Sequence, residues 1–277
     1  MPKNFESHSY RIWEARPDMV EVVQSPQDAN FSDLFGEPQV IQRPEPTQRN
    51  VLYFSHTSGV EAQEATGILQ GIRRVIQEVG SKIQVKNFGA FHVNDGPYGN
   101  SDWYQRQAQT NTNTGYGPQI DANRLDELLR TEPYQKHTPH MDAMAFDQDM
   151  TAIESGAKYN FIYGSARYPH YVMSVKRFRT RIKDPALRQI ALSVIAAHEL
   201  GHNFGLVGRN FNCINKLGLH CNGQCGPCLM EQVDVSGCRT IEAQTRAIVD
   251  RSRWLCNDCL EETNYKREDL EERGILW

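Results

Sequence analysis

One segment, Ala196 to Met230, constrains the fold of this chain more than any other. It opens with His198, Glu199 and His202 in the order H-E-x-x-H, within the stretch PALRQIALSVIAAHELGHNF, which is apolar at helical spacing. Residues four apart on a helix lie one above the other, so the two imidazoles can bind one Zn²⁺ while Glu199 reaches a water on the metal. This arrangement is typical of metal-assisted peptide hydrolysis, in which zinc polarises the carbonyl and the carboxylate transfers the proton.

The residues after this motif are those that accompany it in zinc peptidases, whereas a chance match of three letters would lack them. Gly205 follows where H-E-x-x-H-x-x-G-x-x-H enzymes end the helix and turn toward a third His ligand. Cys228-Leu229-Met230 follows at a suitable distance for the Met-turn, a tight turn beneath the metal, which would place Met230 there.

The third ligand is displaced from its usual position. Position 208 is Gly and position 209 is Arg, and neither side chain binds a metal. His220 is the nearest candidate, and we interpret Val207 to Leu217 as a loop inserted before it. Because the entropic cost of closing a loop grows slowly with length, a surface site tolerates such an insertion.

Composition predicts one globular domain with an extension. The chain has 277 residues, of which 39% are hydrophobic, enough to bury a core. Residues 1–50 are polar and rich in Pro, and we expect either an extended arm packed on the domain or a disordered tail. Residues 51–277 form the predicted domain, with a Cys-rich zinc subdomain at about 213–262.

Charge and hydropathy exclude several classes of partner. The net charge of −4 provides no electrostatic footprint for nucleic acid or an anionic membrane. No apolar run is long enough to span a bilayer, and the N-terminus lacks the apolar core of a secretory signal, so we expect a cytoplasmic protein.

The cysteines are confined to the end of the chain. All seven follow residue 212, and they are Cys213, Cys221, Cys225, Cys228, Cys238, Cys256 and Cys259. Two C-x-x-C pairs, Cys225/Cys228 and Cys256/Cys259, predict a structural zinc site. A redox pair is the alternative, although neither pair begins a helix after a strand, and disulfides remain an alternative if the protein is exported.

Periodicity predicts alternating strands and helices. A strand at Val51–Phe54, an amphipathic helix at Glu61–Val79 and a strand at Ile83–Phe88 form a β-α-β unit with parallel strands. Asn94–Pro118 has no apolar period and is interpreted as an insertion or a substrate-side loop. The other predicted elements are a helix N-capped by Asp121 and ending at Leu129, strands at Met141–Asp147, Asn160–Gly164 and Tyr171–Phe178, and a helix at Thr240–Trp254.

Three further predictions concern polar residues and the sheet edge. Tyr171–Phe178 alternates apolar and polar residues, as an edge or half-exposed strand does, so we expect it either to pair with an extended peptide substrate or to be an ordinary strand with one solvated face. His137, His140 and His170 lie in Pro-containing loops and are interpreted as solvated or capping side chains, and the acidic pair Asp147 and Asp149 as part of a turn.

Together these segments resemble the archaemetzincins, a branch of the metzincin metallopeptidases. The resemblance rests on HELGHNFGL, LHC, CLM and LCNDCL, with MDAMAFDQDM, NFIYGSA and VMSVKRFR upstream, and it covers roughly residues 51 to 262. It implies an α/β zincin-like fold with a mixed, mostly parallel sheet, and a zinc metallopeptidase of modest, aminopeptidase-like activity on short peptides.

The resemblance also implies two zinc ions in each chain. His198, His202 and His220 would bind the catalytic zinc, with Glu199 as the general base and Met230 in the Met-turn. The structural zinc would be held by four thiolates, those of Cys221, Cys228, Cys256 and Cys259.

The chain departs from the family pattern in two places. One is the loop before His220, and the other is Cys225, which could replace Cys221 in a knuckle with Cys228. Cys213 and Cys238 have no counterpart. Two other functions fit the sequence: a non-catalytic, zinc-stabilised binding protein that keeps the fold, and a zinc-ribbon module that binds nucleic acid or a protein.

Overall fold

The computed structural model describes residues 49–90, 98, 100–110, 117–154, 157–206, 220–221, 226–233, 240–272 and 274. All of them belong to one compact unit, Pro44–Trp277. The predicted extension, residues 1–50, lies outside the described residues except for its last two, so its separate status stays a prediction.

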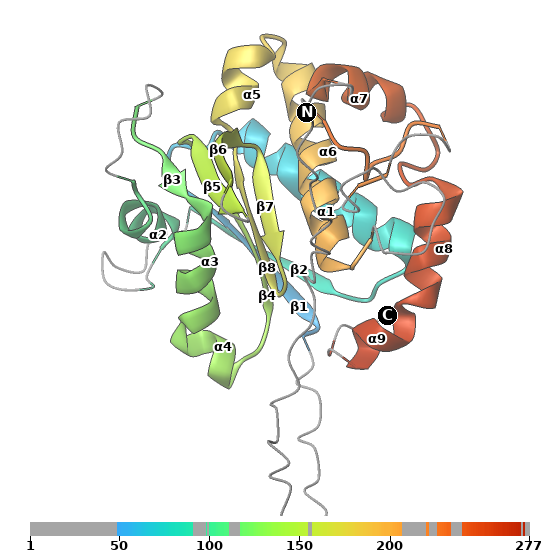
Figure 1. The fold of residues 1–277 in the computed structure, drawn as a ribbon, viewed down its shortest axis with the longest axis horizontal. Helices are drawn as coiled ribbons and strands as arrows, with labels where there is room; N and C mark the ends of the chain where they lie inside the picture. The colour runs from blue at the N-terminus through green and yellow to red at the C-terminus, as the bar shows by residue number, and fades with distance from the viewer. Residues whose placement is uncertain are drawn as a thin grey trace, which may run out of the picture. The chain divides into compact units, whose positions relative to one another are not determined.

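A five-stranded sheet forms the centre of this unit (Figure 1). Its strands, in spatial order, are β2 (Gln84–Gly89), β1 (Val51–His56), β4 (Met141–Phe146), β8 (His170–Ser174) and β7 (Gly164–Arg167). The first four run parallel, and β7 pairs with β8 in the antiparallel direction at the edge. The sheet is therefore mixed and mostly parallel, as the sequence predicts.

Helices cover both faces of the sheet (Figure 1). On β4, Ala143 and Ala145 belong to the same apolar cluster as α1 (Ala62–Val79) and α6 (Pro185–Asn203). The intervening residues Met144 and Phe146 belong to a second cluster, with α2 (Ser101–Gln107) and α3 (Ala122–Thr131). Strand alternation thus divides the core into two layers.

Small residues allow α1 and α6 to pack against each other at short range. A Cβ added to Gly67 would lie 2.5 Å from the carbonyl oxygen of Gln189, and one added to Gly71 would lie 1.9 Å from that of Ser193. The hydroxyl of Ser193 donates a hydrogen bond to the carbonyl oxygen of Gly67 at 2.7 Å. This contact fixes the axial position of α6, the helix that carries the H-E-x-x-H motif.

The remaining elements lie around this core. They are β3 (Ile120–Asp121), β5 (Met150–Glu154) and β6 (Ala157–Ile162) in a small second sheet, and the helices α4 (Pro133–His137), α5 (Lys176–Arg181), α7 (Ile241–Ile248), α8 (Asn257–Tyr265) and α9 (Arg267–Glu272). In the described part of the chain, no helix combines the length and apolar character needed to cross a bilayer.

Several predicted elements are confirmed and two are corrected. Asp121 caps α3 by accepting a hydrogen bond from the backbone N–H of Asn123 at 2.9 Å, as predicted. The predicted irregular stretch at 94–118 contains α2. Most residues of this helix are polar, so its sequence has no apolar periodicity that would predict a helix. The predicted edge strand at 171–178 is wrong, because β8 is an internal strand that is buried along its length and is followed by α5. The edge strand is β7.

Candidate metal centres and active site

Helix α6 carries the first part of the candidate active site. The carboxylate of Asp184 caps its N-terminus by accepting a hydrogen bond from the backbone N–H of Ala186 at 2.9 Å. The helix ends at Asn203, and Gly205 follows with φ of +68°, a left-handed conformation that suits glycine. His198 and Glu199 are both buried on this helix.

The side chains of His198, His202 and His220 converge. One ring nitrogen of each lies within 4.8 Å of the others. The Nε2 atoms of His198 and His202 are 3.1 Å apart, and the rings of His198 and His220 are stacked with centroids 5.3 Å apart. The structure therefore brings His220 to the two helix histidines, whereas the proposed inserted loop, Val207–Leu217, lies outside the described residues.

These three imidazoles are neutral and suited to bind zinc at neutral pH. Burial lowers the pKa of His198, lowers that of His202 well below its ordinary value, and lowers that of His220 to about 3. Nδ1 of His198 lies 2.8 Å from the carbonyl oxygen of Leu229, so it is the donating nitrogen and Nε2 is left with a free lone pair. Neutral histidines with oriented rings are the ligands that zinc prefers.

Glu199 lies beside this cluster, against the first residue of the edge strand. A Cβ added to Gly164 would lie 2.5 Å from Oε1 of Glu199, so only glycine leaves room for the carboxylate. Below it, Tyr171 of β8 is fully buried, and its hydroxyl has no hydrogen-bond partner among the described residues. Burial and, secondarily, the charge of Glu199 hold the pKa of Tyr171 well above its ordinary value.

A tight turn at residues 228–231 lies under α6. The backbone N–H of Glu231 donates a hydrogen bond to the carbonyl oxygen of Cys228 at 3.1 Å. Within the turn, Met230 is fully buried, and a Cβ added to Gly201 of α6 would lie 2.5 Å from its sulfur. The same turn supplies the carbonyl oxygen of Leu229 that orients His198.

A second cluster consists of thiols. Cys221, Cys228, Cys256 and Cys259 are buried and form no disulfide, and their sulfur atoms lie within 4.8 Å of one another. Hydrogen bonds from the neighbouring thiols lower the pKa of Cys256 well below its ordinary value, while those of Cys228 and Cys259 are raised. Four converging sulfurs suit a tetrahedral zinc.

The alternative ligand and the two unassigned cysteines cannot be compared with this cluster. Cys225, Cys213 and Cys238 lie outside the described residues, whereas Cys221 lies inside the cluster. The two clusters are joined through the chain, because His220 and Cys221 are consecutive and the turn at 228–231 contacts both.

A third buried group corrects the interpretation of two loop histidines. His140 is buried, and its Nε2 lies 3.0 Å from a carboxylate oxygen of Glu132 and 3.2 Å from one of Asp142. His170 is also buried, with Nε2 2.6 Å from the carboxylate of Asp126. Neither is solvated, because each is buried against carboxylates: His140 against Glu132 and Asp142, which are near it in the sequence, and His170 against Asp126, which is far from it. His137 is exposed, as predicted.

The group around His140 is satisfied by protein atoms. Its Nδ1 lies 2.6 Å from the carbonyl oxygen of Thr138, the hydroxyl of Tyr104 donates to Glu132 at 2.5 Å, and Gln135 donates to Asp142 at 2.8 Å. An imidazolium between two carboxylates accounts for every contact. We therefore interpret the group as a buried ion network, although its donor atoms are spaced closely enough to hold a metal.

This network is expected to make the free energy of unfolding depend on pH. Burial lowers the pKa of His140, but the hydrogen bonds that its ring donates to Asp142 and Glu132 outweigh this effect and raise the pKa from 6.5 to about 10. Since the folded-state pKa is raised, the stabilisation is complete below pH 6.5 and is lost as the pH rises through about 10. Between these two pH values the free energy of unfolding should fall by about 1.4 kcal/mol for each pH unit.

Urea unfolding at a series of pH values between neutrality and about 10 measures this dependence. The wild type should lose stability with pH more steeply than the His140→Gln variant, whose side chain does not titrate. Equal slopes for the two proteins would contradict the buried imidazolium. A difference in the free energy of unfolding that is the same at every pH would report the loss of the hydrogen bonds of His140 and not its titration.

Sequence reasoning missed two residues of the candidate active site. The sequence pattern places Gly164 at the end of a predicted strand, whereas in the structure this glycine allows the close approach of Glu199. Tyr171 begins the predicted edge or half-exposed strand, whereas its side chain is fully buried in the apolar cluster that includes α6. The acidic pair Asp147 and Asp149 lies in the short connection between β4 and β5, as predicted for a turn.

Comparisons with known proteins find similarity to solved structures alone. Neither a protein-family model nor a curated protein matches the chain. Archaemetzincin from Methanopyrus kandleri is similar, with 20% sequence identity and a TM-score of 0.49 over 83% of this chain and 99% of that one. A zinc-dependent peptidase from Methanocorpusculum labreanum is similar, with 16% identity and a TM-score of 0.40 over 77% of this chain and 100% of that one.

Proposed function

We propose that the chain is a zinc-dependent peptidase with two zinc ions, one catalytic and one structural. The observation that carries this proposal is the convergence of three neutral imidazoles, from His198, His202 and His220, beside the carboxylate of Glu199. A buried zinc site with three histidines keeps a fourth position open for water or substrate. Zinc bound there would lower the pKa of a water molecule and polarise a carbonyl group.

The residues of the chain supply the remaining chemistry. Glu199 accepts the proton of the attacking water and then passes it to the leaving amine, which requires a carboxylate held within hydrogen-bond reach of both. Gly164 leaves space for that carboxylate, and the carbonyl oxygen of Leu229 holds the ring of His198. The turn that contains Met230 supports the metal ligands from below, in the role of a Met-turn.

The proposed substrate is a short peptide bound along β7. This strand ends the main sheet and begins at Gly164, beside the proposed base. An extended peptide could therefore add to the sheet through main-chain hydrogen bonds and present a carbonyl group to the metal. Aminopeptidase-like cleavage is the proposed activity, and hydrolysis of a panel of peptides with free and blocked N-termini tests it.

The metal content of the purified protein tests the proposed site. We expect two zinc ions for each chain, falling to about one in His220→Ala, because a site with two histidines holds zinc weakly. The matched control is His137→Ala, which removes an exposed histidine and should leave both ions in place. Two ions in His220→Ala would exclude His220 as a ligand, and a single ion in the wild type would favour a non-catalytic, zinc-stabilised binding protein.

A further inference from the structure

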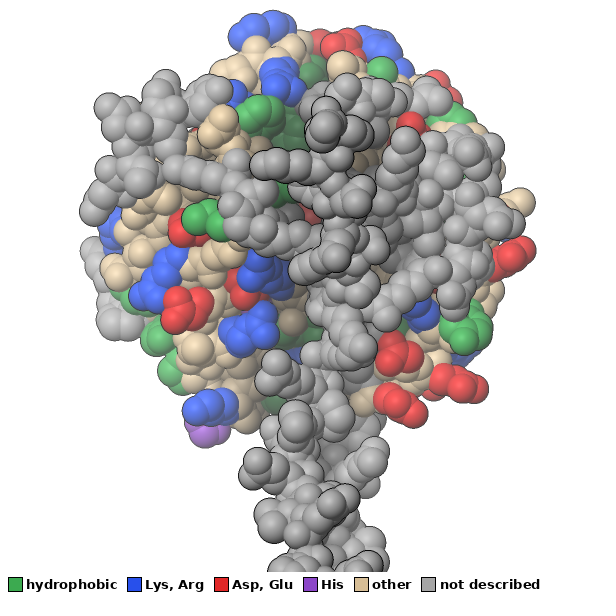
Figure 2. All heavy atoms as spheres, in the orientation of Figure 1, with side chains coloured by type: hydrophobic (Ala, Val, Ile, Leu, Met, Phe, Trp, Pro, Cys, Tyr) green, Lys and Arg blue, Asp and Glu red, His purple; other side chains and the backbone are tan. Residues whose placement is uncertain are grey.

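The segment that contains α5 concentrates positive charge beside the proposed active site. The sequence from Lys176 to Lys183, KRFRTRIK, contains five cationic residues, although the chain as a whole has a net charge of −4. Figure 2, drawn in the orientation of Figure 1, shows Lys and Arg side chains at the top of the molecule, over α5. Two of the five form close pairs with buried carboxylates: Arg177 with Asp149 at 2.8 Å, and Arg179 with Glu64 at 2.6 Å.

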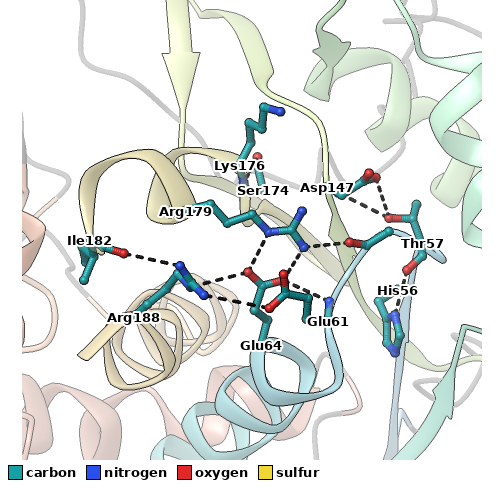
Figure 3. A network of polar contacts seen from close by, with 11 residues as sticks. His56, Thr57, Glu61, Glu64, Asp147, Ser174, Lys176, Arg179, Ile182 and Arg188 are labelled. Carbon is teal, nitrogen blue, oxygen red and sulfur yellow. Dashed lines mark hydrogen bonds and ion pairs between the residues drawn. The ribbon is translucent and has the colours of Figure 1, made fainter. Parts of the chain in front are cut away.

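The pair between Arg179 and Glu64 fixes the position of α5 (Figure 3). The guanidinium of Arg179 donates to both oxygens of Glu64, at 2.8 and 2.6 Å, and to the carbonyl oxygen of Gly59 at 2.7 Å. Arg188 of α6 approaches the same carboxylate to 3.7 Å. Three elements, α1, α5 and α6, are thereby held together, and the side chain of Lys176 points away from this network (Figure 3).

A third cation of this segment, Arg181, lies over aromatic rings. Its guanidinium carbon is 5.0 Å from the ring centre of Phe161 and 5.6 Å from that of Tyr163, and it donates a hydrogen bond to the hydroxyl of Tyr163. The guanidinium of Arg177 lies over the same ring of Phe161, at 4.4 Å. Arg181 itself is exposed, so a ligand in solution can reach it.

This group of Arg181, Phe161 and Tyr163 adjoins the proposed base. Tyr163 directly precedes Gly164, whose Cα lies against the carboxylate of Glu199. Because a strand advances about 3.3 Å for each residue, a peptide that pairs with β7 would extend from the base to the arginine within a few residues. A guanidinium stacked on rings is held in a plane and presents paired N–H donors that match a carboxylate.

We infer that Arg181, stacked on Phe161 and Tyr163, is a specificity-determining residue that binds a carboxylate of the peptide substrate. The inference rests on the proposed function, because it takes peptides to bind beside Glu199. The carboxylate can belong to an acidic side chain or to the C-terminus of the peptide. Both have the same chemistry, so the experiment separates them.

Three fluorescent peptides of one length serve as probes. The first contains one Glu and ends in an amide, the second contains Gln in its place and ends in a free acid, and the third contains Gln and ends in an amide. Their affinities are measured by anisotropy on zinc-loaded Glu199→Gln protein, which should not cleave them. We expect the first or second peptide to bind about fivefold more tightly than the third, as a partly exposed ion pair would give.

Variants of the arginine then locate the effect. In the Glu199→Gln background, Arg181→Gln should remove the preference for the carboxylate peptide. Arg181→Lys should keep part of it, since lysine retains the positive charge but lacks the paired N–H donors of the guanidinium. Lys183→Gln is the matched control, because it removes an exposed cation from the same segment and should keep the preference. Equal affinities for the three peptides, a preference that survives Arg181→Gln, or equal losses in both glutamine variants would overturn the inference.

A different result would contradict the proposed peptidase function. If the wild-type protein with both zinc ions cleaves none of a panel of peptides, the peptidase assignment is wrong, whatever the affinity ratios are. If it cleaves neutral peptides while the affinity ratios stay at one, the peptidase assignment holds and the role of Arg181 is wrong.

Discussion

Glu199→Gln is expected to lower kcat for peptide hydrolysis by about 10²- to 10⁴-fold while zinc stays bound. The substitution keeps the size of the side chain, so the space beside Gly164 remains filled, but an amide cannot accept a proton from water. The proposed ligands of the catalytic zinc, His198, His202 and His220, are unchanged in this variant. The loss should therefore fall on the chemical step and not on folding or metal content.

Single-turnover and steady-state kinetics on protein of measured zinc content test this expectation. KM should change little, because in the proposed mechanism Glu199 transfers a proton and does not bind the peptide. Glu242→Gln is a suitable control, since it makes the same change on the exposed surface of α7. Full activity in Glu199→Gln would show that another group is the base, and loss of zinc would show that the carboxylate supports the metal.

Cys256→Ser is expected to have the largest effect on stability. The sulfur of Cys256 lies in the cluster with Cys221, Cys228 and Cys259, and its backbone N–H donates to the sulfur of Cys228 at 3.4 Å. If this cluster holds zinc, loss of one thiolate weakens metal binding, and metal binding is part of the folding free energy. We expect the free energy of unfolding to fall by several kcal/mol, on the order of 5 kcal/mol.

The same substitution should affect the active site only through the fold. The turn at 228–231 is held by the thiol cluster and by the hydrogen bond from the N–H of Leu229 to the carbonyl oxygen of Trp254, at 2.7 Å. The carbonyl oxygen of Leu229 also orients His198. Urea unfolding, zinc content and kcat under native conditions are the measurements, and we expect stability and one zinc to be lost before activity.

Cys225→Ser is the control for this prediction. Because the described cluster contains Cys221, replacement of Cys225 should leave both zinc ions and the stability unchanged. If Cys225→Ser lost a zinc and Cys221→Ser did not, Cys225 would be the fourth ligand. If Cys256→Ser kept both ions and its stability, the cluster would be a set of buried thiols without a metal.

Local spacing made part of this site predictable. His198, Glu199 and His202 share one helix, and the helical repeat of about 3.6 residues by itself places side chains four apart on one face. The same reasoning identified α1, α3 and the β-α-β unit, because each has a regular apolar period or a capping residue such as Asp121. These features depend on neighbours in the sequence, so the sequence contains the necessary information.

Other features of the site could not be predicted, because they depend on tertiary packing and not on local sequence patterns. The Cys221, Cys228, Cys256 and Cys259 group could be proposed only through a resemblance, because its pairs are separated by dozens of residues. The burial of His140 and His170 is not predictable from their Pro-containing segments, because it depends on the packing that brings them against the carboxylates of Glu132, Asp142 and Asp126. The edge of the sheet was assigned to β8 because its alternation of apolar and polar residues is typical of one solvated face, whereas both faces are covered by helices.

The amino-acid sequence is sufficient to predict the helix with its two histidines and glutamate, the α/β pattern and the two C-x-x-C pairs. Only the folded structure shows that His220 meets that helix, that β7 is the edge strand, and that Gly164 lies against Glu199. The physical reason is that backbone periodicity sets which side chains share a face within one element. Which elements become neighbours is set by the order of the strands and by burial of both faces of the sheet, and these depend on contacts between residues far apart in the chain.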